Sequence, residues 1–369
     1  MSLEHAWKEI VSGEKKGFLV GLSRSALGAL SGLYGTVMAK RNAKYDANDE
    51  LIYRSSIPVI SVGNITAGGT GKTPMVAYIC QFYKTLGQKP VVLTRGYKAS
   101  LKKGSHVVSD GTKVLLNAFE SGDEASLLAS TLQTVPVVIG SSRAASAELA
   151  MKELWPDVFV LDDAFQHRRM GRDLDIVLID ATNPFGYEYV LPRGLLREPL
   201  EGLKRADVII VTKANQISEK ELRNLENRLQ VMVPDLPVLL SNHQAGEVIP
   251  LFIEGENIDK EHPVFAVTAI GSPASFHKTL EQEGYEVGME LSFPDHHVFT
   301  EQEIASIFKT GLSKGMTQLV ITEKDAVKWR PLLEGKELPM KVSVLPICIH
   351  IWQGETLLQE RLRSLVERV

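Results

Sequence analysis

The strongest constraint on the fold is a glycine-rich segment that ends in Gly71-Lys72-Thr73. An apolar run at residues 57–62 precedes it and is typical of a buried strand, and residues 73–79 continue with a helical pattern. Glycines without a Cβ let backbone N–H groups close around phosphate oxygens, and the N-terminus of the following helix adds a partial positive charge. A strand, a glycine-rich turn and a helix in this order predict a phosphate-binding loop.

The residues of this loop have expected roles in binding ATP and Mg²⁺. Lys72 is expected to reach the β- and γ-phosphates, and the Thr73 hydroxyl is expected to bind Mg²⁺. The loop departs from the usual spacing at Thr66, where a glycine normally stands. The alternative is an ordinary turn that contains Lys-Thr. The expected nucleotide-binding residues of the loop are Gly68, Gly69, Thr70, Gly71, Lys72 and Thr73.

Composition narrows the class of protein. The chain has 369 residues, of which 44% are hydrophobic and 23% are charged, as in ordinary soluble proteins with room for two domains. The net charge of −4 argues against a general nucleic-acid binder. Cys80 and Cys348 both lie in apolar runs, which favours buried thiols in a reducing compartment over a disulfide framework.

Apolar runs alternate with helical patterns along most of the chain. Because helices cover both faces of a parallel sheet, this alternation predicts an α/β fold with a P-loop NTPase-like three-layer α/β/α domain. The pattern resumes after Asn215 and predicts a second, smaller α/β domain. We therefore expect an N-terminal helix at 1–45, the P-loop domain at 46–215 and the second domain at 216–369.

The N-terminal segment combines bases with apolar residues. Residues 15–45 contain six bases and no acids, and Arg24 divides the apolar stretch at 17–34. Neither half reaches the roughly 20 apolar residues that span a bilayer. Apolar residues flanked by bases favour an amphipathic helix that lies on an anionic membrane. The alternative is a helix packed on the domain core.

Acidic residues follow two of the predicted strands. Asp162 and Asp163 end one strand, and Asp180 ends another. Two adjacent carboxylates repel each other unless a cation joins them, so the pair is the better candidate for binding Mg²⁺. Gln166 and His167 follow within one helical turn, on the same faces as the two acids. The alternative role for such an aspartate is to cap a helix.

Two further segments have the composition of functional loops. Residues 191–199 contain Arg193 and Arg197, which could bind phosphate. Asp295 is followed by His296 and His297, which could be metal ligands, a proton relay or part of a polar loop.

Together these motifs resemble the tetraacyldisaccharide 4'-kinases, the lipid A 4'-kinases of Gram-negative bacteria. The run from Asp162 to Arg168 is far more specific than Gly-Lys-Thr, which many NTPases share. The motifs that carry the resemblance occur in the family's order: Ser61-Val62-Gly63-Asn64, Gly68-Gly69-Thr70-Gly71-Lys72-Thr73-Pro74, Arg95-Gly96-Tyr97, Gly122-Asp123-Glu124, Asp162-Asp163-Ala164-Phe165-Gln166-His167-Arg168, Leu196-Arg197-Glu198-Pro199 and Asp295-His296-His297.

The resemblance implies an activity and a location. It implies transfer of the γ-phosphate of ATP to the 4'-hydroxyl of a tetraacylated glucosamine disaccharide 1-phosphate, which gives lipid IVA. It also implies two α/β/α domains with the active site in the cleft between them. The N-terminal helix would touch the cytoplasmic face of the bacterial inner membrane.

The resemblance also implies residue roles. Asp123 would be the catalytic base, supported by His296 rather than the adjacent His297, and Lys72 would hold the transferring phosphoryl group. Arg143 would lie near the phosphates of the nucleotide or acceptor. The Mg²⁺ and phosphate region would comprise Thr73, Asp162, Asp163, Gln166, His167 and Glu198. From the residues alone, Asp123 at a helix start could equally be a helix cap.

Two other classes of P-loop protein remain as alternatives. A GTPase or metal-insertion chaperone would normally carry an Asn-Lys-x-Asp-like loop, of which residues 212–215 and 322–325 are poor versions. A partition-type ATPase would usually carry a lysine in place of Ala67.

Overall fold

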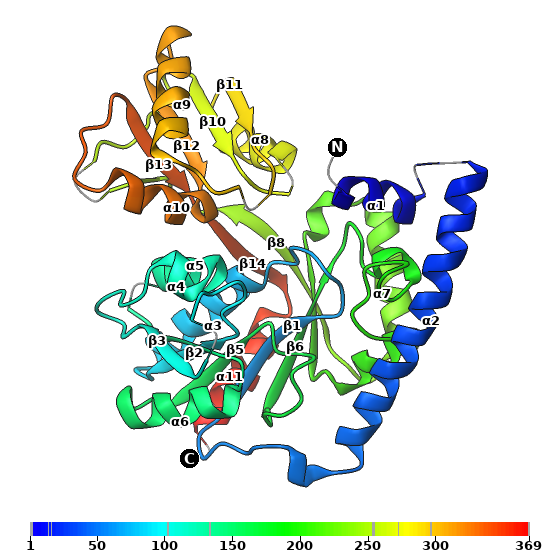
Figure 1. Cartoon of the computed structure of the whole chain (residues 1–369). Coiled ribbons are helices and arrows are strands. Elements are labelled where there is room, and N and C mark those ends of the chain that lie inside the picture. Colours follow the sequence, from blue (N-terminus) through cyan, green and yellow to red (C-terminus); the bar gives the residue numbers. More distant parts are fainter. Residues whose placement is uncertain are drawn as a thin grey trace. The chain divides into compact units, whose positions relative to one another are not determined.

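The chain folds into two compact units, each formed by segments that are not consecutive in sequence. This computed structural model describes residues 3–13, 15, 17–101, 103–132, 134–252, 255–271, 273–295 and 297–367 (Figure 1). The first unit comprises Met1–Arg95, Gly140–Asn242 and Ile349–Val369, and the second comprises Gly96–Ile139 and His243–Cys348.

The first unit is organised around a largely parallel sheet. Strand β1 pairs in parallel with β5 and β6, β5 with β2, β6 with β7, and β7 with β8. Every residue of β1, β2, β5 and β7 is buried, as the continuous apolar runs predict. The strand order is β14 (Ile347–Gln353), β8 (Val238–Ala245), β7 (Val208–Thr212), β6 (Leu174–Asp180), β1 (Val59–Asn64), β5 (Val158–Asp162) and β2 (Pro90–Thr94).

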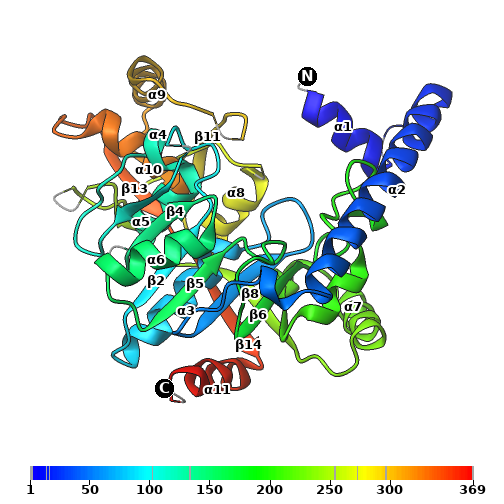
Figure 2. The ribbon, with the colours of Figure 1, turned by 60° about the horizontal axis from the view of Figure 1, so that its bottom comes forward.

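Helices cover both faces of this sheet. Val177 and Val211 pack in one core with Leu225 and Leu229 of α7 (Glu219–Met232), while Ile176 and its alternating neighbours are buried on the opposite face. Figures 1 and 2 show α7 on the side of the sheet nearest the N-terminal helices. The remaining helices are α3 (Lys72–Thr85), α6 (Arg143–Glu153), α11 (Glu355–Val366), and the short 3₁₀ helices η1 (Asp49–Leu51), η2 (Gly186–Glu188), η3 (Leu200–Arg205) and η4 (Ala214–Gln216). The predicted α/β fold is confirmed.

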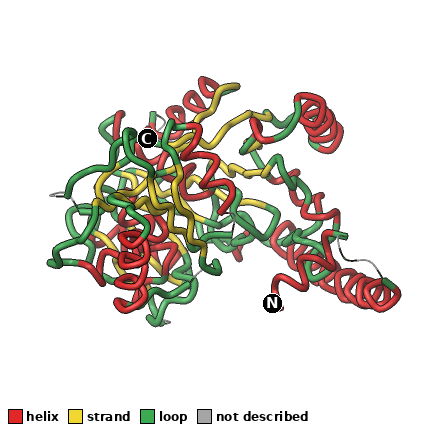
Figure 3. Tube along the Cα trace, turned by 90° about the horizontal axis from the view of Figure 1, so that it is seen from above, coloured by secondary structure: helices red, strands yellow, loops and turns green. Residues whose placement is uncertain are grey.

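Two helices form the N-terminal segment, α1 (Leu3–Ser12) and α2 (Phe18–Asp46). Helix α2 is the long helix at the lower right of Figure 3. Its buried residues, Ser31, Met38 and Tyr45, lie on one face. At about 100° per residue, the exposed Phe18, Leu22 and Leu33 lie on the opposite face. The exposed Leu19, Leu30 and Val37 lie along one flank of the helix, next to that face. No helix among the described residues is long and apolar enough to cross a bilayer.

The second unit has its own five-stranded sheet. Its order is β11 (Val287–Ser292), β10 (Val264–Thr268), β12 (Gln318–Thr322), β13 (Lys341–Leu345) and β9 (Ile249–Pro250), with only β9 antiparallel to its neighbour. Trp329 is fully buried against Phe299 and Phe308. The other elements are β3 (Ser105–Ser109), β4 (Val137–Gly140), α4 (Ala118–Ser121), α5 (Asp123–Leu132), α8 (Pro273–Gln282), α9 (Glu301–Ser313) and α10 (Glu323–Leu333).

The two units interleave along the chain. Residues 96–139 group with the second unit because α5 packs on α10, and the C-terminal segment returns to the first unit as most of β14 and α11. From the sequence we expect one domain boundary near residue 215 and a separate helix at 1–45. That division stays a prediction about domains, while the units describe which segments pack together.

A close backbone contact at Gly63 gives a test of the first unit's packing. A Cβ built on Gly63 would lie 2.6 Å from Phe165 Cβ and 2.7 Å from Phe165 N. We expect Gly63→Ala to lower the free energy of unfolding by about 1–3 kcal/mol because neither neighbour is the end of a flexible side chain. Urea unfolding measures this change.

The matched control is Gly32→Ala on α2, where a Cβ would meet no described atom within 4 Å. Because alanine favours helix more than glycine does, this variant should be as stable as the parent or up to about 1 kcal/mol more stable. Equal unfolding midpoints for Gly63→Ala and the parent would contradict the packing argument.

Candidate active site

The glycine-rich turn between β1 and α3 has the backbone of an anion-binding loop. Gly68 and Gly71 have φ values of 128° and 88°, and Gly71 adopts the left-handed conformation directly before α3 begins at Lys72. A Cβ on Gly68 or Gly69 would meet no described atom within 4 Å, so this side of the loop is open to a ligand. The confirmed strand–loop–helix arrangement therefore presents backbone N–H groups and a helix N-terminus to one space.

Polar side chains behind the loop fix its conformation. Asn64 Nδ2 donates hydrogen bonds to Thr66 O (2.8 Å) and Thr70 Oγ1 (2.9 Å). Thr212 Oγ1 donates to Thr70 O at 3.0 Å, and Lys213 Nζ donates to Gly69 O at 3.2 Å. The loop carbonyls and the Thr70 hydroxyl are therefore engaged by the protein. Such support preorganises the backbone for binding.

Asp180, the alternative metal-binding acid, has protein partners of its own. Its carboxylate forms an ion pair with Lys213 and accepts hydrogen bonds from the backbone N–H and the hydroxyl of Thr182. This arrangement favours the Asp162-Asp163 pair as the acids of the site.

Asp163 joins two cations. Lys72 Nζ lies 3.4 Å from Asp163 Oδ1, and Arg197 Nη1 donates to both oxygens at 2.7 and 2.9 Å. Burial alone would raise the pKa of Asp163, but Lys72 and Arg197 outweigh it, so the pKa lies below its usual value and the group is ionised at neutral pH. Asp163 also has a φ of 49°, uncommon for a residue with a Cβ, which marks a constrained position.

Asp162 and Arg143 lie at the same edge of the sheet. The buried carboxylate of Asp162 accepts a hydrogen bond from Thr94 Oγ1 at 3.0 Å. Arg143, 2% exposed, donates to the backbone oxygens of Asp162 (3.2 Å) and Gly140 (2.9 Å). Burial lowers the pKa of Arg143 to about 10, with the charges of Asp162 and Asp163 opposing the shift. The guanidinium therefore remains a cation at neutral pH.

His167 follows the acidic pair as a neutral group. Burial, together with the charges of Arg143 and Arg172, lowers its pKa to about 4. At neutral pH the imidazole is therefore uncharged and has a lone pair that can accept a hydrogen bond or bind a metal ion.

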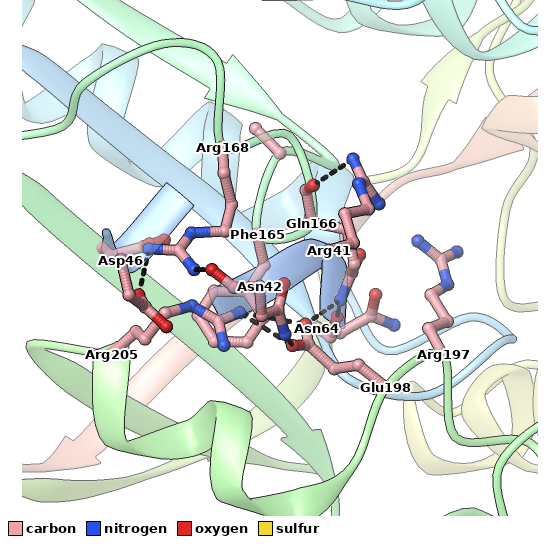
Figure 4. A network of polar contacts seen from close by, with 12 residues as sticks. Arg41, Asn42, Asp46, Asn64, Phe165, Gln166, Arg168, Arg197, Glu198 and Arg205 are labelled. Carbon is pink, nitrogen blue, oxygen red and sulfur yellow. Dashed lines mark hydrogen bonds and ion pairs between the residues drawn. The ribbon is translucent and has the colours of Figure 1, made fainter. Parts of the chain in front are cut away.

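Gln166 and Glu198 belong to one hydrogen-bonded network (Figure 4). Glu198 is fully buried, and both of its oxygens accept hydrogen bonds from Arg205 Nη2 at 3.0 and 2.8 Å. Gln166 Nε2 donates to Oε1 at 3.0 Å, and Asn42 Nδ2 donates to Oε2 at 2.8 Å. These partners surround the carboxylate, so the structure gives no support to the expected metal-binding role of Glu198.

Oxygen donors suited to Mg²⁺ remain at the loop. The described residues contain no cluster of three or more His, Cys, Asp or Glu side chains arranged to hold a metal. Mg²⁺ is commonly held by a hydroxyl, one or two carboxylates and phosphate oxygens instead. Thr73, Asp162 and Asp163 supply such donors, so this set fits the ion.

Asp123, in the second unit, is the first residue of α5. The preceding Gly122 has a φ of 86°, and a Cβ there would lie 2.3 Å from Tyr97 O. Only glycine fits that approach, which fixes where Asp123 begins its helix. Helix α5 packs on α10, where the charge of Asp123 helps to oppose the lowering of the pKa of Lys328 by burial.

The second unit also contains charged residues that the sequence analysis did not select. Lys324 Nζ lies 2.8 Å from Asp295 Oδ1, and Lys328 Nζ lies 3.8 Å from the fully buried Asp325. Lys324, Asp325 and Lys328 follow β12 closely in the chain, and the first two lie in residues 322–325, which match a guanine-binding motif only poorly. The available signal was an acid and two bases directly after a buried strand.

Only one histidine of the Asp-His-His motif can be placed. His296, the expected partner of Asp123, lies outside the described residues. His297 stacks on Phe293 at 4.8 Å, and its Nε2 lies 3.2 Å from Glu303 Oε1 without alignment for a hydrogen bond. His297 therefore packs in an aromatic cluster of the second unit.

Comparison with known proteins covers nearly the whole chain. Residues 23–367 match the family model described as tetraacyldisaccharide-1-P 4'-kinase. The tetraacyldisaccharide 4'-kinase of Chlorobium luteolum is 37% identical over 348 residues, which cover 91% of this chain and 95% of the relative. That of Pelobacter propionicus is 38% identical over 331 residues, covering 89% of each chain.

A solved structure agrees with this result. The "apo" form of LpxK from Aquifex aeolicus, crystallised in complex with ATP, is 31% identical, with a TM-score of 0.73. The match covers 93% of this chain and 99% of that one. The chain belongs to the tetraacyldisaccharide 4'-kinase family.

Proposed function

We propose that this chain is an ATP-dependent kinase that phosphorylates the 4'-hydroxyl of a tetraacylated glucosamine disaccharide 1-phosphate, giving lipid IVA in lipid A biosynthesis. The observation that carries the proposal is the open glycine-rich loop with Lys72 held against Asp163 at its end. The relatives are named for this reaction, and the solved relative was crystallised with ATP. Their coverage of nearly the whole chain favours a kinase over a GTPase or a partition-type ATPase.

The loop and its neighbours bind the triphosphate. Backbone N–H groups at residues 68–73 and the N-terminus of α3 face the phosphate oxygens. Lys72 places its ammonium on the β- and γ-phosphates, and Arg143 and Arg197 add positive charge at the same edge of the sheet. Phosphoryl transfer depends mainly on positioning and on stabilising negative charge, which these groups supply.

Thr73, Asp162 and Asp163 would hold Mg²⁺. When bound, the ion neutralises charge on the β- and γ-phosphates. Asp163 has a second role within the protein, because it fixes the positions of Lys72 and Arg197. Thr94 orients Asp162 by its hydrogen bond.

The acceptor hydroxyl must lose its proton. The 4'-oxygen attacks the γ-phosphorus, the bond from that phosphorus to the β–γ bridging oxygen breaks, and ADP leaves. Asp123 takes the hydroxyl proton, and His296 orients Asp123 and shares positive charge with it.

Helix α2 brings the enzyme to its lipid acceptor. Its exposed face carries Leu22, Leu30 and Leu33, and the exposed bases Lys40 and Lys44 lie near its C-terminal end. Apolar burial and attraction to anionic lipids together hold such a helix at a membrane surface. The proposed location is the cytoplasmic face of the bacterial inner membrane, and no nucleic acid is bound.

The direct test is a transfer assay with ATP or GTP, with and without the lipid disaccharide. We expect phosphorylation of the lipid with ATP and a loss of turnover to background in Lys72→Ala, because the ammonium holds the transferring group. A folded Lys72→Ala protein with near-normal activity would refute the proposed site. Nucleotide hydrolysis at the same rate with and without the lipid would favour a GTPase or a partition-type ATPase.

The proposed base pair has a distinctive kinetic signature. Asp123→Asn and His296→Ala should each lower kcat by about 10²–10⁴-fold, with little change in melting temperature. The double variant should be little worse than either single variant, because both changes remove one function. Losses of kcat that multiply in the double variant would show that the two residues act independently. A lowered melting temperature with normal kcat would make Asp123 a helix cap.

Membrane binding by α2 can be measured with sedimenting vesicles that contain anionic lipid. Replacing Leu22, Leu30 and Leu33 together with serine should weaken binding at least about tenfold, since burying each leucine contributes more than 1 kcal/mol. High salt should weaken the binding of the parent protein in part.

The control for this test is Val231→Ser on α7, which removes an apolar residue, 84% exposed, from outside α2. It should bind vesicles as the parent does. Equal binding by the triple variant and the parent would remove α2 from the membrane contact.

A further inference from the structure

The inner face of α2 contacts the segments that flank the phosphate loop. Tyr34 OH donates to Arg197 O at 2.9 Å, and Arg41 Nη2 donates to Gln166 O at 2.9 Å. Asn42 differs from both because its Nδ2 donates to the fully buried carboxylate of Glu198, at 2.8 Å (Figure 4). Helix α2 therefore reaches a buried charge through one side chain.

A continuous chain of hydrogen bonds runs from Asn42 to the phosphate loop. Gln166 Nε2 donates to Glu198 Oε1 at 3.0 Å and to the backbone oxygen of Asn64 at 2.8 Å. Asn64 is the last residue of β1. The side chain of Asn64 then holds Thr66 O and Thr70 Oγ1 within the loop. Four side chains thus connect the surface helix with the backbone that faces the phosphates.

Backbone pairing reinforces this connection. Arg197 N donates to Ile65 O, and Ala67 N donates to Leu195 O, each at 2.7 Å. The residue next to Arg197 is Glu198, so a shift of the Glu198 carboxylate acts on the start of the loop through both the main chain and Gln166.

The charge of Glu198 makes the Asn42 contact consequential. A hydrogen bond to a charged group is stronger than one between neutral groups, and a buried acceptor left without its donor is costly. Arg205 on η3 still neutralises the carboxylate when Asn42 is removed. The fold can therefore survive the loss, while the carboxylate is free to turn and to draw Gln166 away from Asn64.

We propose that Asn42 is a positioning residue for the phosphate loop: through Glu198 and Gln166 it fixes Asn64, and thereby sets the affinity of the loop for ATP. The inference rests on the proposed function in taking ATP as the ligand. It adds a second role for α2, whose opposite face carries the exposed leucines.

The test compares Asn42→Ala with the parent in Mg²⁺ buffer without lipid acceptor, by titration with a fluorescent ATP analogue and competition by ATP. Asn42→Ala should raise the dissociation constant of ATP about 5–10-fold and raise KM for ATP more than it lowers kcat. A change of that size corresponds to about 1–1.4 kcal/mol. Binding to anionic vesicles should not change, because the outer face of α2 is intact.

Thr36→Ala is the matched control. Its exposed hydroxyl donates only to Gly32 O of the same helix among the described contacts, at 2.9 Å, so its removal should leave ATP affinity within twofold of the parent. Gln166→Met removes the hydrogen bonds from Gln166 to Glu198 and Asn64 with a side chain of similar size. This variant is measured in place of Asn42→Ala if that protein does not fold. The two variants should have similar effects, and the double variant should be no worse than the weaker-binding single variant.

The outcomes separate the possible explanations. An ATP affinity within twofold of the parent in Asn42→Ala, or losses that multiply in the double variant, would overturn the proposal. A parent protein that binds ATP and responds to Asn42→Ala but does not phosphorylate the lipid would refute the proposed function alone. A parent that binds no ATP would refute both.

Discussion

Anion binding by the first unit depends on holding one short backbone loop open. The N–H groups at residues 68–73 can face a phosphate only while the loop carbonyls are engaged elsewhere, and Asn64, Thr212 and Lys213 engage the loop from behind. Each supporting group lies at or just beyond the carboxyl end of a parallel strand, where the sheet provides a fixed frame. The sheet therefore acts as the support for the loop.

Positively charged side chains lie around this loop, where they can bind the phosphates of a nucleotide. Asp163 is partly buried beside Lys72 and Arg197, which keep it ionised, and it fixes both cations in return. Arg143 stays charged although buried, while His167 is neutral. The cations are thus preorganised before a nucleotide arrives, which lowers the reorganisation that binding and transfer require.

The sequence was sufficient to identify candidate site residues that lie together in short continuous motifs. The run from β1 into α3, the acidic pair after β5 and the bases around α2 are each continuous in sequence, and the structure places them as strand, loop, strand end and surface helix. The sequence was not sufficient to predict the surroundings of Glu198, which follows an arginine in a Pro- and Gly-containing loop. Its partners Asn42, Gln166 and Arg205 come from other parts of the chain, so only folding shows that its oxygens are engaged.

By itself, the sequence determined the α/β class, the phosphate loop and the family, because buried strands, glycine-dependent turns and short motifs are encoded within a few neighbouring residues. The tertiary structure alone decided which side chains share a hydrogen bond. It joined Lys72 to Asp163, and α2 to Glu198, and it grouped residues 96–139 with the second unit. These contacts link residues far apart in the chain, and their formation depends on how elements pack rather than on any local preference.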